Sequence, residues 1–304
     1  MAFTAADVKT LREMTGVGMM ECKKALTEAD GNMDKAVEWL REKGLATAQK
    51  KAGRIAAEGV AYADVIDGVG VAVEVNAESD FVAKNELFNE YVKGVAAVIA
   101  KYNPADVAAL YELPYGNGKT VKEEQNDKVL VIGENINVRR FARFEGGVSV
   151  PYVHMGGRIG VLVNLKVSEG LEDKVTEVGK DMAMQIAALN PRFWDKGQVT
   201  QDVIDEEKKI MMAQMAEDPK MANKPEKVRE NIVLGKLGKF YSENCLLQQE
   251  FVKDNTMTVE QYMKSSAKAL GGTIEFVNAV RFEKGEGIEK RQDNLAEEVA
   301  KMVK

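Results

Sequence analysis

The chain has 304 residues, 45% of them hydrophobic and 30% charged, so it has the composition of a folded protein of about two domains rather than of a disordered one. A formal net charge of -6 argues against a protein whose main task is to bind the phosphate backbone of nucleic acids. Two cysteines without a CxxC pair and a single histidine exclude a zinc ribbon and a disulfide scaffold and fit a reducing compartment, so we expect no metal and no cofactor.

The first sixteen residues lack the apolar segment of a secretory signal, and nowhere do about 18 uncharged apolar residues follow one another. We therefore expect a cytoplasmic protein that has no contact with a membrane. Residues 4–43 have apolar side chains at three- and four-residue spacing, interrupted at Thr15–Gly18 and Asp30–Asn32, which predicts three short amphipathic helices. A bundle of about forty residues is near the lower limit for independent folding, so it is expected to be a docking module.

A basic, alanine-rich segment, residues 42–54, follows the three helices and is interpreted as a linker with helical tendency, so the first domain is predicted to be 1–53. The period then changes to that of strands. Residues 60–66 and 69–75 favour β-branched side chains and meet at Asp67–Gly68, which predicts an antiparallel hairpin. A helix is expected to follow, with Ser79 or Asp80 as its N-cap and an end at Asn103–Pro104.

The same order of elements occurs a second time. Residues 148–154 and 159–165 predict another hairpin, and a helix after them ends at Asn190–Pro191. A third strand is repeated in one ungapped register: Gly133, Ile136, Arg143, Phe144 and Glu145 match Gly271, Ile274, Arg281, Phe282 and Glu283. These matches predict a duplicated β-β-α-β unit, with one subdomain at 54–145 and the other at 146–193 and 241–284.

The second copy is interrupted by residues 194–240, which are rich in helix formers and are broken at Asp218–Pro219 and Lys224–Pro225. This pattern predicts an inserted antiparallel helical hairpin, a short coiled coil whose apolar seam is either closed within the hairpin or offered to a partner or a second copy. Residues 285–304 are expected to form a C-terminal helix. The expected fold class is α+β, with antiparallel sheets in both subdomains.

No constellation of residues predicts a catalytic site, so the protein is not expected to be an enzyme. Gly118-Lys119-Thr120 ends like a phosphate-binding loop, but the leading glycine position is Leu113, and a surface turn is the better interpretation. A nucleotide-using enzyme built on it is the weakest alternative. Gly16 and Gly18 lack the third glycine of a dinucleotide fingerprint, and His154 has no nucleophile motif beside it.

Asp80-Phe81 comes directly after the first hairpin, where side chains project from the edge of a sheet. Two interpretations are open. In the first, Asp80 and Phe81 project from the corner and have a function there. In the second, Asp80 favours the helix dipole, and Phe81, seven residues before Phe88, continues the buried stripe of the helix. The corresponding corner of the second copy, 168–171, has no aromatic residue, so the first copy carries a feature that the second does not need.

Several blocks of the sequence, taken together, resemble the bacterial elongation factor Ts family. They follow the family's order over nearly the whole chain: residues 15–26, 31–36, 40–41, 79–83, 133–136, 139–141, His154, 160–163, 245–249 and 251–252. The resemblance implies a guanine nucleotide exchange factor that binds elongation factor Tu, in its GDP-bound and nucleotide-free forms, and expels GDP. It also implies that the three-helix module is similar to a ubiquitin-associated (UBA) domain. The alternative is a non-catalytic, chaperone-like subunit that holds Tu or another protein.

The resemblance also implies which residues contact the partner. Thr15, Gly16, Val17, Gly18, Met19 and Met20 would contact its GTP-binding domain, and His154, Met155 and Gly156 its third domain. Asp80 and Phe81 would reach between its helices, with Ser79–Val82 as the wedge that disturbs the magnesium and phosphate site. The hairpin tip, 217–225, is longer than the family's usual turn, so no role is carried over to it, and self-association through the hairpin stays open.

Overall fold

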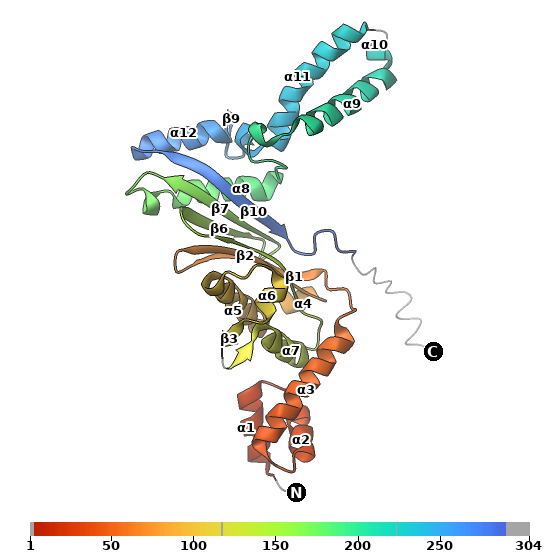
Figure 1. Ribbon diagram of the computed structural model, residues 1–304, viewed down its shortest axis with the longest axis vertical. Coiled ribbons are helices and arrows are strands. Elements are labelled where there is room, and N and C mark those ends of the chain that lie inside the picture. Colours follow the sequence, from red (N-terminus) through yellow and green to blue (C-terminus); the bar gives the residue numbers. More distant parts are fainter. Residues whose placement is uncertain (1–2, 117, 223, 290–304) are drawn as a thin grey trace. The chain divides into compact units, whose positions relative to one another are not determined.

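A computed structural model describes residues 3–116, 118–222 and 224–289. The chain forms two compact units. Unit 1 consists of Met1–Phe144, Val153–Gly160 and Phe282–Lys304, and unit 2 of Glu145–Tyr152 and Val161–Arg281. The expected α+β class is confirmed, with helices at the N-terminus and sheets of antiparallel strands after them (Figure 1). The predicted domain limits divide the chain more finely than these units do, and they stay predictions.

Three helices form the N-terminal module as expected: α1 (Ala5–Thr15), α2 (Met19–Glu28) and α3 (Met33–Lys51). Thr4 and Asp7 form a capping box at the start of α1, and a left-handed Gly16 ends it. The module's core consists of small and branched apolar side chains, namely Val8, Leu11, Val17, Cys22, Ala25, Leu26, Ala29, Ala36 and Leu40.

The helical tendency expected of residues 42–54 is confirmed as far as Lys51, where α3 ends. Its buried Gly44 lies against α7 (Val121–Ile132), where a Cβ would come within 3.3 Å of the Asn126 carbonyl oxygen. Beyond the three-helix module α3 thus packs against α7, and the predicted limit of the first domain at residue 53 stays a prediction.

The sheet of unit 1 has the order β1-β2-β5, built from β1 (Glu58–Ile66), β2 (Val69–Ala77) and β5 (Asn137–Phe144). The predicted turn between β1 and β2 is present, with Asp67 and Gly68 both at positive φ (51° and 79°). The helix α5 (Glu86–Tyr102) packs on this sheet and contributes Phe88, Tyr91 and Val95 to a core shared with the strands.

The long helix expected from Asp80 to Tyr102 is in fact two helices. The short α4 (Asp80–Ala83) ends at Lys84, and the side chain of Asn85 caps the start of α5. Residues 104–132, for which only a surface turn was predicted, form α6 (Val107–Tyr111), the small hairpin β3–β4 (Pro114–Gly116 and Lys119–Thr120) and α7.

The phosphate-loop interpretation of Gly118-Lys119-Thr120 is contradicted by this geometry. The Lys119 ammonium group lies 2.6 Å from the Asp127 carboxylate and 3.6 Å from that of Glu124. The Thr120 side chain caps α7 by accepting a hydrogen bond from the backbone of Glu123. Both polar side chains therefore serve the fold.

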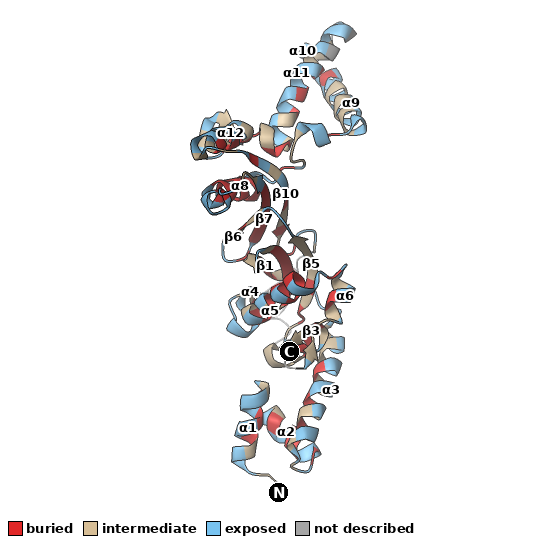
Figure 2. Cartoon of the chain, turned by 60° about the vertical axis from the view of Figure 1, so that its left-hand side comes forward, coloured by how far each residue is buried: buried red, intermediate tan, exposed pale blue. Residues whose placement is uncertain are grey.

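Unit 2 contributes most of a second sheet of order β10-β7-β6, formed by β6 (Val148–His154), β7 (Ile159–Val167) and β10 (Ile274–Glu283). The helix α8 (Thr176–Leu189) packs closely on β6, since a Cβ on Gly179 would lie 2.4 Å from Val150. Figure 2 shows buried positions along the strands and one side of α8. Besides the inserted helices described below, unit 2 contains η1 (Glu172–Lys174), η2 (Lys196–Gln198), η3 (Leu246–Gln248), β8 (Glu250–Phe251), β9 (Asp254–Thr258) and α12 (Val259–Leu270).

The two copies share more than the predicted β-β-α-β pattern. In each sheet the third strand lies beside the second strand of the hairpin. In each copy a small two-stranded ladder and a helix precede that third strand. The helices α7 and α12 begin with capping boxes at Thr120 and Thr258, and both end at a left-handed glycine, Gly133 and Gly271. The repeat is therefore β-β-α-ladder-α-β.

The inserted segment forms a helical hairpin, as expected, of α9 (Gln201–Glu217), the short α10 (Pro219–Ala222) and α11 (Glu226–Asn244) (Figure 1). Part of its apolar seam is closed within the hairpin and its base, with Met215, Val233, Leu237 and Phe240 buried.

After β10, residues 284–287 form turns. Residues 290–304, the greater part of the expected C-terminal helix, lie outside the described residues.

Candidate partner-binding surface

The β2–α4 corner presents Phe81 to solvent. Its side chain is 80% exposed, whereas the neighbouring Val82 is only 6% exposed and packs into the core of unit 1. Because the helix is interrupted between α4 and α5, Phe81 does not share the helical phase of Phe88. The interpretation of Phe81 as part of a buried stripe is therefore wrong, and the exposed ring lies beside an anchored valine.

Carboxylates hold the backbone of this corner. Ser79 donates two hydrogen bonds to Glu134, from its backbone nitrogen (2.9 Å) and its hydroxyl (2.6 Å). Glu78 accepts a hydrogen bond of 2.7 Å from the backbone nitrogen of Asn135. Ser79 is the N-cap residue of α4, but its hydroxyl does not cap the helix. The prediction of Ser79 as the N-cap residue is confirmed by position, but its hydroxyl donates to a carboxylate of another element and makes no capping hydrogen bond.

An open hollow of about 1160 Å³ lies beside Phe81. It has charges of both signs: Arg54, Arg158 and Lys284 are basic, and Glu58, Glu78, Asp80 and Glu134 are acidic. Lys284 pairs with Glu58 and Arg54 with Glu78. The 47% exposed Ile55 adds an apolar contact to the same wall. An exposed aromatic beside a mixed-charge hollow is a surface suited to a folded protein partner.

The α1–α2 loop is anchored at its centre and exposed at its end. Val17 is buried, and its backbone oxygen accepts a hydrogen bond from Cys22, whose pKa is raised by burial. The Thr15 hydroxyl donates to the Leu11 backbone oxygen, while Gly16 and Gly18 are exposed. The following methionines, Met19 and Met20, are 53% and 76% exposed and present flexible, polarisable side chains.

The β6–β7 turn carries the third predicted patch. Met155, at φ 48°, is 67% exposed, Gly156 is exposed, and His154 is half-buried. The turn is fixed against β1, because the Ala61 backbone nitrogen donates to the Gly157 oxygen at 2.8 Å. A methionine is thus held in an exposed, left-handed conformation.

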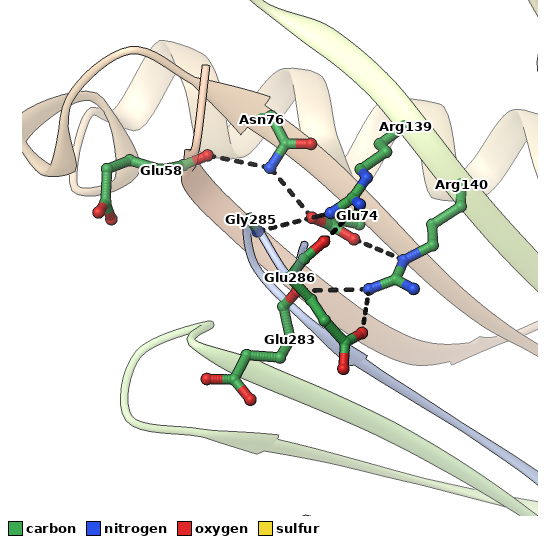
Figure 3. Close-up of polar contacts among 8 residues, drawn as sticks. All are labelled: Glu58, Glu74, Asn76, Arg139, Arg140, Glu283, Gly285 and Glu286. Carbon is green, nitrogen blue, oxygen red and sulfur yellow. Dashed lines mark hydrogen bonds and ion pairs between the residues drawn. The ribbon is translucent and has the colours of Figure 1, made fainter. Parts of the chain in front are cut away.

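A buried charge cluster fastens the chain after β10 to the first sheet (Figure 3). Glu74 of β2 is completely buried, and its carboxylate accepts hydrogen bonds from Asn76, Arg139, Arg140 and the Gly285 backbone nitrogen. Arg140 also pairs with Glu286 at 2.9 Å. Burial acts to lower the pKa of Arg140, but its hydrogen bonds to Glu286 and Glu74 outweigh that effect and raise it. The cluster fixes Lys284 near one wall of the hollow.

All predicted site residues belong to unit 1, but only some come together. Ser79, Asp80 and Phe81 share their hollow with Arg158, the last residue of the β6–β7 turn. The α1–α2 loop lines a separate hollow of about 270 Å³ with Arg41 and Lys119. Sequence reasoning missed Arg54, Ile55, Arg158 and Lys284 at the first hollow. Glu134 lay inside a family-like block but had no role assigned.

Within residues 3–116, 118–222 and 224–289, no three side chains of His, Cys, Asp or Glu are grouped so that they could hold a metal ion. In the same residues, no helix has the length and apolar character needed to cross a membrane.

Comparison with known proteins gave consistent matches. The protein-family model described as Elongation factor TS matches residues 78–286. Elongation factor Ts of Syntrophotalea carbinolica is 47% identical over 308 residues, covering 100% of both chains. Elongation factor Ts of Clostridioides difficile is 48% identical over 304 residues, with 99% of each chain covered. That of Clostridium kluyveri is 47% identical over 306 residues, with 99% of this chain and 98% of the relative covered.

Proposed function

Because the chain belongs to the elongation factor Ts family, we propose that it is a cytoplasmic guanine nucleotide exchange factor that binds elongation factor Tu and accelerates the release of GDP. Such a factor makes and breaks no covalent bond, so it needs no catalytic residue and no cofactor. The observation that supports this best is Phe81, an aromatic side chain 80% exposed on a corner whose backbone is held by carboxylates.

The physics of exchange explains why a rigid exposed ring is useful. An exchange factor binds the empty GTPase more tightly than the filled one, and by linkage it weakens nucleotide binding by the same factor. That weakening requires strain at the phosphate and magnesium site of the partner. A phenylalanine has few rotatable bonds, so little of its binding free energy is lost to side-chain ordering.

The three patches then have different tasks. The wedge, Ser79–Val82, inserts Asp80 and Phe81 between helices of the partner. The α1–α2 loop, through Met19 and Met20, and the β6–β7 turn, through His154, Met155 and Gly156, hold the partner in register. A few anchors are expected to dominate the binding energy, as in protein interfaces generally.

The test is stopped-flow release of a fluorescent GDP from elongation factor Tu, with and without the chain. We expect the parent chain to accelerate release strongly. Phe81→Ala should still bind nucleotide-free Tu, but the maximum release rate at saturating chain should fall roughly 10- to 100-fold, the effect of losing a central anchor.

The control is Leu189→Ala, which truncates another exposed apolar side chain, 47% exposed at the end of α8 in unit 2. It should release GDP at the parent rate. A parent chain that binds Tu without accelerating release would favour the alternative, a chaperone-like binding subunit. If the parent chain accelerates GDP release and Phe81→Ala does so equally, the exchange activity stands and the role of Phe81 as a wedge is wrong.

A further inference from the structure

The corner that carries Phe81 and the loop after α7 hold each other by two crossed carboxylates. Glu134 accepts both hydrogen bonds of Ser79, at 2.9 and 2.6 Å. In the opposite direction, the carboxylate of Glu78 accepts from the Asn135 backbone at 2.7 Å. Hydrogen bonds to charged acceptors are stronger than neutral ones. Two pairs of neighbouring residues, Glu78–Ser79 and Glu134–Asn135, are therefore tied together.

The loop that supplies Glu134 is itself fixed at several points. Gly133 ends α7 in the left-handed conformation, and its carbonyl oxygen accepts from the Lys51 ammonium group at 2.6 Å. Asn135 is buried, 3% exposed, and its side chain donates to the Arg54 backbone oxygen at 2.8 Å. Glu134 thus projects from a rigid support towards a corner whose own helix, α4, is only four residues long.

The second copy of the repeat supplies an internal comparison. In the register that aligns Gly133 with Gly271, the position of Glu134 is occupied by Gly272 and that of Asn135 by Thr273. There Ser168, at the corresponding corner, bonds to Thr273 through backbone and hydroxyl groups, and Leu171 is buried, 5% exposed. The carboxylate is present in the copy that exposes an aromatic ring and absent from the copy that buries its apolar residue.

From this arrangement we propose that Glu134 is a positioning residue for nucleotide exchange. It fixes Ser79, so that the corner keeps its conformation when Phe81 enters the partner. The inference rests on the proposed function. If the β2–α4 corner is flexible, part of the binding free energy is used to order it, and Phe81 moves instead of straining the partner. Loss of Glu134 therefore lowers the maximum rate of GDP release more than it lowers affinity for Tu.

Two variants separate positioning from a direct charge contact with the partner. Glu134→Ala removes both acceptors, and the maximum release rate should fall about tenfold, while the concentration of chain giving half that rate changes less than about threefold. Glu134→Gln can still accept from the Ser79 backbone and can donate to its hydroxyl. It should keep a rate within about threefold of the parent. A direct charge contact would instead make both variants equally slow.

A double-mutant cycle gives the second readout. If Glu134 acts through Phe81, Glu134→Ala should have almost no further effect in a Phe81→Ala background, within about twofold. Glu90→Ala, which removes an exposed glutamate of α5, is the matched control and should behave like the parent. Equal losses in the parent and Phe81→Ala backgrounds would overturn the inference.

A measurement on the free chain is independent of exchange. With 4-fluorophenylalanine placed at position 81 alone, the fluorine resonance should narrow and shift towards that of the unfolded chain in Glu134→Ala, and stay at the parent position in Glu134→Gln. An unchanged resonance in Glu134→Ala overturns the positioning role. If the parent chain does not release GDP from Tu, the proposed function fails, while the fluorine measurement still tests whether Glu134 orders the corner.

Discussion

Phe81 and Leu171 belong to corresponding corners of the two copies and have opposite surroundings. Phe81, on the short helix that ends before Asn85, is 80% exposed, and Leu171 is 5% exposed. The sequence predicted the location of this corner. Helical spacing, which relates Phe81 to Phe88, favoured a buried ring, whereas the resemblance to the elongation factor Ts family implied a ring that reaches into a partner. The side chain of Asn85 caps a new helix, α5, after α4 has ended at Ala83, so Phe81 and Phe88 lie on different helices.

Cys245, at the base of the helical hairpin, carries a prediction about pH. The thiol is fully buried, and burial, with a smaller contribution from the Asp195 charge, raises its pKa to about 11 from the ordinary value of 9.0. The folded state therefore keeps its proton at pH values where the unfolded state has lost it. The contribution of this group to stability is complete below pH 9 and is lost as the pH rises towards 11.

Reactivity measures this shift. At pH 8 the folded thiol should form about a hundredfold less thiolate than the unfolded one, so alkylation by iodoacetamide should be slower by a similar factor. The experiment uses Cys22→Ala, so that Cys245 is the single thiol. Native Cys245 that titrates near 9 would contradict the prediction, and Cys245→Ala should flatten the loss of stability between pH 9 and 11.

At the scale of elements, amphipathic helices and turn-linked strands could be predicted, and α7 could not. The face that α7 buries includes Glu124, Gln125 and Asn126, so apolar spacing gives no sign of it. The ladders β3–β4 and β8–β9 contain strands of two to five residues, too short for a period to be recognised. The hollow beside Phe81 escaped prediction because Arg54, Arg158 and Lys284 come from segments that only the folded chain brings together.

The matching capping boxes of α7 and α12 predict matching stability effects. Thr120→Ala and Thr258→Ala should each lower the free energy of unfolding by about 1 kcal/mol, because each leaves helix N-terminal amide groups without their acceptor. Urea unfolding can assign each loss to its unit, since Trp39 lies in unit 1 and Trp194 in unit 2. Thr120→Ala should move the transition followed at Trp39, and Thr258→Ala the one followed at Trp194.

Serine at the same positions is the control, because its hydroxyl also caps and should restore most of the loss. A loss well below 0.5 kcal/mol in both alanine variants would show that neither box stabilises its helix.

At the scale of the whole molecule, unit 1 is assembled from three separate stretches of chain, the last beginning at Phe282. The buried Glu74 joins the outer two of these stretches. It accepts from Arg139 and Arg140 within the first stretch and from the Gly285 backbone in the last. The loss of one donor to a buried, charged acceptor is destabilising, so the residues after β10 contribute to the stability of unit 1.

Gly285 gives a direct test of this closure. It has φ 69°, and a Cβ there would lie 2.0 Å from the Ala57 carbonyl oxygen, so Gly285→Ala must displace the segment. We expect a loss of roughly 2 to 4 kcal/mol from strain and overpacking, measured by urea unfolding at Trp39.

Gly287→Ala is the matched control, because Gly287 has φ 73° and nothing within 4 Å of its Cβ position. It should lose only the backbone strain, roughly 1 to 2 kcal/mol. Equal losses in the two variants would show that closure at Gly285 contributes nothing.

The hydrogen bond between Gly285 and Glu74 also has a consequence for folding during synthesis. The two residues are 211 positions apart. A ribosome adding roughly 5 to 20 residues per second takes roughly 10 to 40 s between them. Of the four donors to the Glu74 carboxylate, Arg139 and Arg140 follow 65 and 66 positions later and Gly285 follows 211 positions later. The carboxylate therefore stays partly hydrated until Gly285 has been made and has reached the central strand of the first sheet.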